Sequence, residues 1–303
     1  MSISKKFEDW FTAGQIVAEV LRVTKKLKPG VYLLRICEEL EKMIIKKGAK
    51  PAFPVNISIN EIAAHYAGLP GDKMKIPEIG LVKLDVGAHV NGAIADAAIT
   101  IGVGGLPPKI QSLLKATESV LIEAISVIKD GIRVNEISNI VWKKAHEFGF
   151  GVLVDLGGHS IERWKLHAGI FIPNKPVKGK GVKLHKGQIL AIEPFLVATS
   201  RDGSTIPVWE KTHIFAINEK KKSRDTFLKV IYRKFNYLPF AARWIVKNQK
   251  EYNKLLQRFS MYSKQGLIHF YPPLIEARGA WVAQFEHTVL VKENSAEILT
   301  TVN

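Results

Sequence analysis

The stretch LVKLDVGAHVNGAIADAAITIGV, which runs from Leu81 to Val103, decides how this chain folds. Two runs of strand-forming residues flank Asn91-Gly92, and Asn-Gly is a preferred centre of a two-residue hairpin turn. Such a turn pairs Asp85 with Ala98 and puts Asp96 on the same face as Asp85, roughly 7–8 Å away along the diagonal. Two acids among apolar strand residues are costly unless a cation lies between them, so the hairpin predicts a divalent metal site. The alternative is that one of the acids is a turn or edge carboxylate that faces water.

Three more ligand-type residues stand in apolar, strand-like surroundings. His159 lies in LGGHSI, after two glycines that permit close backbone approach, Glu193 lies in QILAIEPF, and Glu286 lies in WVAQFEHTVLV. Taken singly, each is more often a core polar group or an exposed strand residue. Together with Asp85 and Asp96 they offer four carboxylates and one imidazole, enough ligands for two divalent ions of Co, Mn, Fe or Zn. Two such ions can activate a shared water, which predicts hydrolysis of an amide or ester.

Composition excludes several other classes of protein. The chain has 303 residues, of which 47% are hydrophobic and 24% charged, so it can bury a full core and is not intrinsically disordered. The single cysteine, Cys37, excludes an internal disulfide and favours a reducing compartment. The sequence has neither a secretion signal nor a run long enough to span a membrane, so we expect a cytoplasmic protein. A nucleophile elbow, a P-loop and a Rossmann fingerprint are also missing from the sequence.

Most of the chain is an internal repeat. A helix from about Phe7, the turn LKPG and a second helix return about 101 residues later as a helix from Pro108, the turn IKDG and a second helix. A glycine after each helix supplies the left-handed cap position. Each half also yields a histidine, His65 and, 102 residues later, His167. The duplication predicts a pseudo-two-fold α+β architecture with a site where the halves meet.

Residues 212–280 differ from the rest of the chain in net charge and in the pattern of their aromatic residues. They hold fourteen Lys and Arg against four acids, which is a net +10 out of the total of +16. Aromatic residues recur here at spacings near 3 to 4, which predicts short amphipathic helices. We interpret the segment as an inserted basic helical subdomain, and residues 1–211 and 281–303 as the catalytic domain. The charge is either a solvated helix face or a docking surface for a polyanion.

Seven motifs, spread over nearly the whole chain, resemble the archaeal kind of type 2 methionine aminopeptidase. They are AFPVN (Ala52–Asn56), AAHYAG (Ala63–Gly68), KLDVGAHVNGAIAD (Lys83–Asp96), GGHSIERWKLHAG (Gly157–Gly169), AIEPF (Ala191–Phe195), YPPL (Tyr271–Leu274) and AQFEHT (Ala283–Thr288). The resemblance implies the pita-bread fold, a curved antiparallel sheet flanked by helices, with an inserted winged-helix-like subdomain at residues 212–280. It also implies removal of the initiator methionine from nascent polypeptides whose second residue is small.

The resemblance further implies roles for single residues. Two divalent ions are held by Asp85, Asp96, His159, Glu193 and Glu286, with Asp96 and Glu286 bridging, Asp85 on one ion, and His159 with Glu193 on the other. Glu193 is the candidate base for the bridging water. The two repeat-related histidines, His65 and His167, match residues that bind the substrate and steady the scissile carbonyl. Positions lining the methionine pocket match Phe53, Leu166, Tyr271 and Leu274, and a further pocket histidine matches His213 across a poorly matching loop.

Two other readings stay open beside this one. A proline-directed peptidase such as prolidase shares the fold and ligands, but there a His-Glu sequence usually follows the second histidine, where this chain has Ala168-Gly169. A catalytically inactive, RNA-binding relative would suit the +10 segment, but such proteins lose ligands. The main departure from the family is Leu196–Asp202 in place of a glycine-rich stretch, which puts the pocket rim in doubt. We expect a monomer whose basic insert docks on ribosomal RNA, and we interpret the remaining histidines and Cys37 as structural or surface residues.

Overall fold

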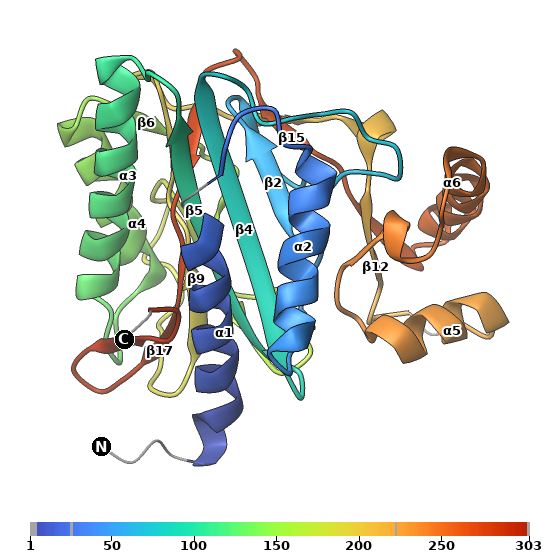
Figure 1. The fold of residues 1–303 in the computed structure, drawn as a ribbon. Helices are drawn as coiled ribbons and strands as arrows, with labels where there is room; N and C mark the ends of the chain where they lie inside the picture. The colour runs from blue at the N-terminus through green and yellow to red at the C-terminus, as the bar shows by residue number, and fades with distance from the viewer. Residues whose placement is uncertain (1–4, 25–26, 222, 302–303) are drawn as a thin grey trace.

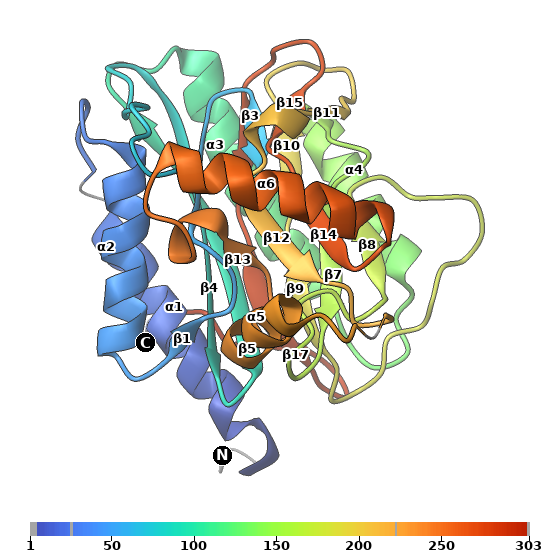
Figure 2. The ribbon, with the colours of Figure 1, turned by 90° about the vertical axis from the view of Figure 1, so that its right-hand side faces the viewer.

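The computed structural model describes residues 5–24, 27–221 and 223–301. Two pairs of helices pack against central strands, and the helices of residues 212–280 lie together on one side of these strands (Figure 1). A view from that side shows α6 (Gln249–Lys264) and α5 (Thr226–Phe235) in front of the central strands (Figure 2). The chain is therefore a mixed α+β structure, as predicted.

The first half of the repeat begins with a helix pair. A 3-10 turn at Lys5–Phe7 leads into α1 (Glu8–Thr24), and α2 spans Leu33–Lys46. Buried apolar residues of α2 recur every three or four positions, which places one face of the helix on the sheet. The strands of this half are β1 (Lys50–Pro51), β2 (Asn56–Ile59), β3 (Ile62–Ala64), β4 (Gly80–Val90) and β5 (Ala93–Val103).

The second half repeats the helix pair as α3 (Pro108–Ser126) and α4 (Val134–Glu147). Gly48 and Gly149 directly follow the C-caps of α2 and α4 in the left-handed conformation, with φ of 88° and 83°, which confirms the predicted caps of these two helices. Gly30 and Gly131 are left-handed too, but they lie in the turns that precede α2 and α4, because α1 ends at Thr24 and α3 at Ser126, so the predicted caps of these two helices are wrong. The strands of this half are β6 (Gly151–Val152), β7 (Gly157–Ile161), β8 (Phe171–Pro173), β9 (Ile189–Ile192), β10 (Phe195–Val197), β11 (Thr205–Pro207), β16 (Val282–Gln284), β17 (His287–Val291) and β18 (Ala296–Ile298).

The described strand pairs are antiparallel and form several linked sheets. The long hairpin β4–β5 belongs to a sheet with β1 and β2, while the second half contributes the sheet β18-β17-β9-β7-β8 and the sheet β16-β10-β6. The halves meet where Glu286, between β16 and β17, exchanges backbone hydrogen bonds with Ala98 on β5. Each helix pair covers its own half, because α1 and α2 share one buried core with β2, β4 and β5, and α3 and α4 share another with β9 and β17.

Residues 212–280 contain strands as well as helices. A three-stranded sheet is formed by β12 (Ile214–Ile217), β13 (Phe240–Ala241) and β14 (Ile268–Tyr271), beside α5, α6 and a 3-10 turn at Ala242–Trp244. The predicted helical spacing of aromatics holds only within α5, since Asn236 ends that helix at φ 57° and Phe240 lies on a strand. The segment packs its own core around Phe215 and Phe259, whose rings are 4.8 Å apart.

Three further findings complete the fold. The last strand of residues 212–280, β15 (Leu274–Glu276), pairs with β3 and β11, so the segment returns directly into the repeat. None of the helices in the described ranges combines the length and the apolar content that crossing a membrane needs. Cys37 is fully buried and unpaired, which confirms its role in packing.

Candidate metal centre

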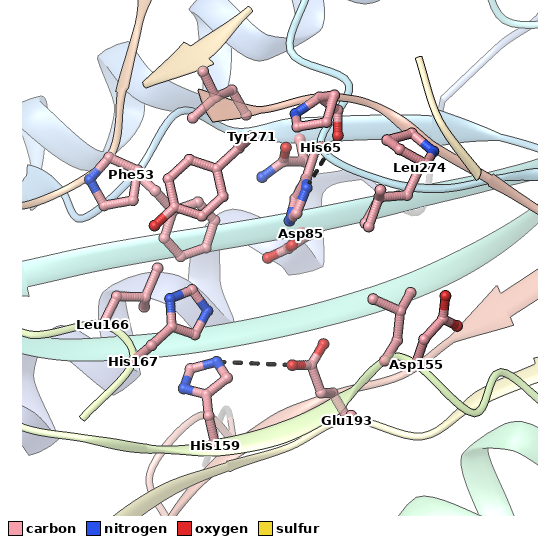
Figure 3. Close-up of a pocket in the computed structure, with 18 of the residues that line it drawn as sticks. Phe53, His65, Asp85, Asp155, His159, Leu166, His167, Glu193, Tyr271 and Leu274 are labelled. Carbon is pink, nitrogen blue, oxygen red and sulfur yellow. Dashed lines mark hydrogen bonds and ion pairs between the residues drawn. The ribbon is translucent and has the colours of Figure 1, made fainter. Parts of the chain in front are cut away.

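A cavity of about 470 Å³ lies where the two halves and residues 212–280 meet. All five predicted metal ligands line it, together with the two predicted site histidines and the four predicted pocket residues. Figure 3 labels three of the ligands, Asp85, His159 and Glu193, beside these histidines and pocket residues. These residues come from segments far apart in the sequence. The structure therefore brings together every site residue that the sequence predicted apart from His213.

The hairpin that carries two of the predicted ligands has the predicted register. Asn91 and Gly92 form the turn with φ of 50° and 83°, Asp85 pairs with Ala98, and Asp96 pairs with Gly87. Strand side chains alternate between faces, so this register puts both aspartates on the cavity side. The backbone of Asp96 is anchored to the other half, because its N–H donates to the hydroxyl of Thr288 at 2.7 Å and that hydroxyl donates back to its carbonyl.

The second half supplies the imidazole and two further carboxylates. His159 lies on β7, where a side chain at Gly158 would come within 2.2 Å of the carbonyl oxygen of Ala191 on β9. That close approach confirms why glycine precedes the histidine. Nε2 of His159 lies 3.7 Å from Oδ2 of Asp96 and 3.7 Å from Oε1 of Glu193. Glu193, just after β9, also accepts a hydrogen bond from Gln284 at 3.3 Å.

The ligand atoms fit a metal centre. Those of Asp96, His159 and Glu286 all lie within 4.8 Å of one another, and all three residues are buried. Three carboxylate oxygens in this cluster are buried without a hydrogen-bond partner in the described part of the chain: Oδ1 of Asp85, Oδ1 of Asp96 and Oε1 of Glu286. A buried anionic oxygen with no partner is costly, and a divalent cation removes that cost.

The pKa values of the clustered residues also support a metal centre. Burial raises the pKa of Asp85 to about 7. Burial, and after it the neighbouring carboxylates, hold the pKa values of Asp96 and Glu286 well above their usual range, and burial with the charge of Asp85 does the same for Glu193. Burial lowers the pKa of His159, which keeps the imidazole neutral and able to bind a metal. This cluster of acids would be fully ionised at neutral pH only with added positive charge.

The two predicted site histidines stand beside the carboxylates. The ring of His167 lies 4.4 Å from that of His159, and Nδ1 of His65 lies 3.2 Å from the carbonyl oxygen of Pro272. His167 touches the solvent that enters the cavity, yet burial among protein atoms lowers its pKa to about 4, and burial lowers that of His65 to about 4 as well. Both rings are therefore neutral at pH 7.

Three of the predicted pocket residues, Phe53, Leu166 and Tyr271, line one side of the cavity in the view of Figure 3, and Leu274 lines the other side, toward Asp155. Phe53 packs so closely on Gly87 that a β-carbon there would lie 2.1 Å from the ring. Leu166 is 9% exposed, and Tyr271 lies 5.5 Å from the ring of His65, edge to face. Tyr271 and Leu274 come from residues 212–280, so this segment closes the cavity from the side seen in Figure 2.

Three residues differ from the expectations or were missed by them. Asn56 lines the cavity directly across the β2–β4 ladder from Asp85, with a buried and unpartnered amide oxygen. Its position at the end of the motif AFPVN is the signal that could have found it. His269, interpreted from the sequence as structural or surface, lines the cavity with its ring 4.6 Å from that of Tyr271. His213 is not among the lining residues; it packs on Tyr66 instead, at 5.2 Å.

Comparisons with known proteins agree with this geometry. A methionine aminopeptidase from Thermococcus onnurineus is 41% identical over 292 residues, which cover 95% of this chain and 97% of the relative. The crystal structure of a methionine aminopeptidase from Thermotoga maritima superposes with a TM-score of 0.71 at 27% identity, covering 99% of this chain and 98% of that one.

A prolidase from Pyrococcus furiosus superposes with a TM-score of 0.65 at 18% identity, covering all of this chain and 66% of that one, a likeness of fold alone. The two solved structures confirm the predicted pita-bread architecture. The sequence signature of metallopeptidase family M24 matches residues 11–293, and the chain therefore belongs to metallopeptidase family M24.

Proposed function

We propose that this chain is a type 2 methionine aminopeptidase of the archaeal kind. It removes the initiator methionine from nascent polypeptides whose second residue is small. The observation that carries the proposal is the buried cluster of four carboxylates and one imidazole in a cavity with an apolar wall. Similarity to methionine aminopeptidases over 95% of the chain supports it.

Five residues would hold two divalent ions, of Co, Mn, Fe or Zn. Asp96 and Glu286 would serve both ions, Asp85 would hold one of them, and His159 with Glu193 would hold the other. The three unpartnered carboxylate oxygens support this assignment, because each is buried and aimed at no protein donor in the described residues. When bound, the two ions supply the Lewis acidity that activates a water and polarises the scissile carbonyl.

The remaining steps fall to side chains of this chain. Glu193 accepts a proton from the attacking water and passes it to the amine that leaves. The products are free methionine and the shortened peptide, and Glu193 returns to its starting state. His167 donates a hydrogen bond to the peptide carbonyl and to the tetrahedral species that follows it. The single N–H of neutral His65 faces the carbonyl of Pro272, so this ring presents its unprotonated Nε2 to an N–H of the substrate. The lowered pKa values favour these roles, since a neutral imidazole keeps one N–H and adds no positive charge beside the metal site.

Substrate choice follows from the apolar wall. Phe53, Leu166, Tyr271 and Leu274 cradle one unbranched thioether side chain, whose flexibility and polarizability suit an aromatic-lined slot. Burial raises the pKa of Tyr271 to about 12, so this phenol stays un-ionised even in moderately alkaline solution. The substrate's second residue must be small, since it lies beside the bulk of the site histidines.

We further propose that residues 212–280 are a basic insert in a catalytic domain of residues 1–211 and 281–303. The insert docks the enzyme on the ribosome, where its substrates emerge. Its net charge of +10 supports docking on RNA phosphates. The densest basic run is Lys220, Lys221, Lys222 and Arg224, of which Lys222 lies outside the described residues. The enzyme works as a monomer in the cytoplasm.

Release of free amino acids from short peptides tests the peptidase proposal. Metal-loaded protein should release methionine from Met-Ala-Ser much faster than valine from Val-Ala-Ser, and faster from Met-Ala-Ser than from Met-Lys-Ser. An Ala-Pro dipeptide tests the prolidase reading in the same assay. Comparable rates on Met-Ala-Ser and Ala-Pro would contradict the proposal, and no hydrolysis of any of these peptides by metal-loaded protein would favour the inactive relative.

A further inference from the structure

A second cavity, of about 680 Å³, lies between α5 and the region where α2, β1 and the tip of the β4–β5 hairpin meet. None of the five proposed metal ligands lines it. Its volume is within the range of cavities that hold small organic ligands. Four aromatic rings and three cations are among the residues that line it: Trp164, Tyr232, Phe235, Trp244, Lys50, Arg233 and Lys234.

The aromatic walls are held in place by the surrounding structure. Trp164 adopts a left-handed backbone conformation with φ 65°, and its N–H donates to the carbonyl of Gly92 at 2.8 Å. Its ring lies 4.8 Å from that of His89 and so close to Gly92 that a β-carbon there would meet it at 2.3 Å. A bulky side chain in that backbone conformation is uncommon and costly, so packing of the ring holds it there.

The opposite wall is made by residues of α5 and the turn that follows β13. The ring of Phe235 lies 5.7 Å from that of Trp244, and the indole N–H of Trp244 donates to Glu41 at 2.9 Å. Tyr232 is 42% exposed, so part of its ring faces the open side of the cavity. Rings fixed in this way present flat apolar surfaces without further ordering when a planar ligand enters.

The charge of the cavity is positive. Among the described residues that line it, Glu41 is the only acid, and Arg243 neutralises it in a buried ion pair. Lys50, Arg233 and Lys234 have no carboxylate within 4.0 Å in the part of the chain that the structure describes, but Lys234 donates to the carbonyl of Trp244 at 3.1 Å. Lys50 and Arg233 are therefore the two cations available to a ligand. Two exposed lysines, Lys46 on α2 and Lys229 one turn before Arg233 on α5, continue the positive surface past the cavity.

We propose that this cavity binds an unpaired nucleotide of a single-stranded RNA. The base stacks on the rings of Trp164 and Tyr232, and the adjoining phosphates lie on Lys50 and Arg233. An apolar ligand would leave both cations unused, and a simple anion would leave the rings unused. RNA is the favoured source, because it offers unpaired bases in loops and its further phosphates can reach the flanking lysines. The inference does not rest on the peptidase activity.

Fluorescence anisotropy of a labelled single-stranded RNA hexamer of mixed sequence tests this site on the full chain. Stacking of one base contributes about 1–3 kcal/mol, so Tyr232→Ala should weaken binding roughly tenfold or more, while Tyr232→Phe, which keeps the ring, should restore it. Arg233→Glu should weaken binding by a similar factor. Lys254→Glu, an exposed charge reversal on α6 outside the cavity, and Val230→Ala, an exposed truncation on α5, are the matched controls and should change it less than about threefold.

Several results would overturn the proposal. Absence of hexamer binding at low salt would do so. If Arg233→Glu lost affinity for the hexamer while Tyr232→Ala kept it, the surface would bind polyanions without a pocket for a base. Heparin has no bases, so competition by heparin as strong as that by RNA would lead to the same conclusion. AMP binding as tightly as the hexamer would assign the cavity to a free nucleotide and refute RNA as its ligand. Cleavage of Met-Ala-Ser by each variant at the wild-type rate would verify that the variants are folded.

Discussion

The guanidinium of Arg243, in residues 212–280, forms a two-pronged ion pair with the carboxylate of Glu41 on α2. Nη1 lies 2.7 Å from Oε2 and Nη2 lies 2.5 Å from Oε1, and the side chains are 3% and 8% exposed. The same carboxylate accepts hydrogen bonds from the backbone of Val55 at 3.1 Å and from the indole of Trp244 at 2.9 Å. The pair therefore ties residues 212–280 to the first half of the repeat.

Removing one partner of this pair should destabilise the fold strongly. Arg243→Met leaves the carboxylate of Glu41 buried without its counter-charge, which should lower the free energy of unfolding by about 3–5 kcal/mol. Urea unfolding measures this change. The double variant Glu41→Leu with Arg243→Met should cost less than the two single variants together, because neither charge is then left alone. The exposed pair of Arg35 with Glu39 is the control, and Arg35→Met should leave unfolding nearly unchanged. A loss of under about 1 kcal/mol in Arg243→Met would contradict the role of the pair.

Gly87 should be required for the shape of the substrate pocket. A β-carbon there would overlap the ring of Phe53, so Gly87→Ala should displace that ring and lower kcat/KM for Met-Ala-Ser about 10²-fold, while metal content stays the same. Gly87→Ala combined with Phe53→Leu should recover part of the loss, since the smaller side chain makes room. Gly105, where a β-carbon meets nothing within 4 Å, is the control position. Full activity of Gly87→Ala would mean that Phe53 does not shape the pocket.

Burial of His213 should make the protein less stable in mild acid. Burial lowers its pKa to about 4, against an ordinary value near 6.5, and Asp72, Arg243 and Lys211 are the charged groups that face it. Because the folded-state pKa is depressed, the unfolded chain binds more protons between pH 4 and 6.5, so stability falls as the pH falls through that window.

His213→Phe keeps the ring against Tyr66 and removes the titration. The stability of metal-free wild type relative to this variant should therefore drop by roughly 2–3 kcal/mol between pH 6.5 and pH 4. Thermal or urea unfolding of both proteins across this range gives the difference. A difference that does not change with pH would show that His213 titrates normally.

Reversing the basic run should weaken docking without touching catalysis. Replacing Lys220, Lys221, Lys222 and Arg224 by Glu should lower ribosome co-sedimentation at least about tenfold at low salt, because these groups would neutralise RNA phosphates by counterion release. Cleavage of a free tripeptide should stay the same, since the proposed metal ligands lie on other segments. Reversal of the exposed lysines Lys178, Lys180 and Lys183 is the matched control. Ribosome co-sedimentation that is unchanged by the charge reversal, or that does not depend on salt concentration, would contradict docking through this run. The basic residues would then form only a solvated helix face.

Much of the site could be predicted because it rests on local sequence rules. The Asn91-Gly92 turn fixed the register of β4 and β5 residue by residue, and the period of 2 then put Asp85 and Asp96 on one face. Gly48 and Gly149 marked the ends of α2 and α4 for the same reason, since a left-handed helix cap is a local conformation.

The features that were missed depend on contacts between distant segments. The helical spacing of aromatics continues past Asn236, but pairing of Phe240 with Phe215 on β12 makes that stretch a strand. His269 stands in an ordinary strand-like context, and only the pairing of β14 with β12 brings it to the cavity. The cavity walled by Trp164 and Tyr232 joins residues of the repeat with residues of 212–280, and no local sequence pattern indicates such a contact.

The number of metal ions bound per chain tests the proposed centre most directly. After equilibrium dialysis against Mn²⁺, elemental analysis of the wild type should find two ions per chain, and protein in this state should release methionine from Met-Ala-Ser. Asp96→Ala should bind neither ion tightly and lose that activity, because a bridging carboxylate serves both ions, whereas the exposed control Asp130→Ala should keep both. Fewer than two ions at saturation in the wild type, or two ions and full activity in Asp96→Ala, would contradict the proposed centre.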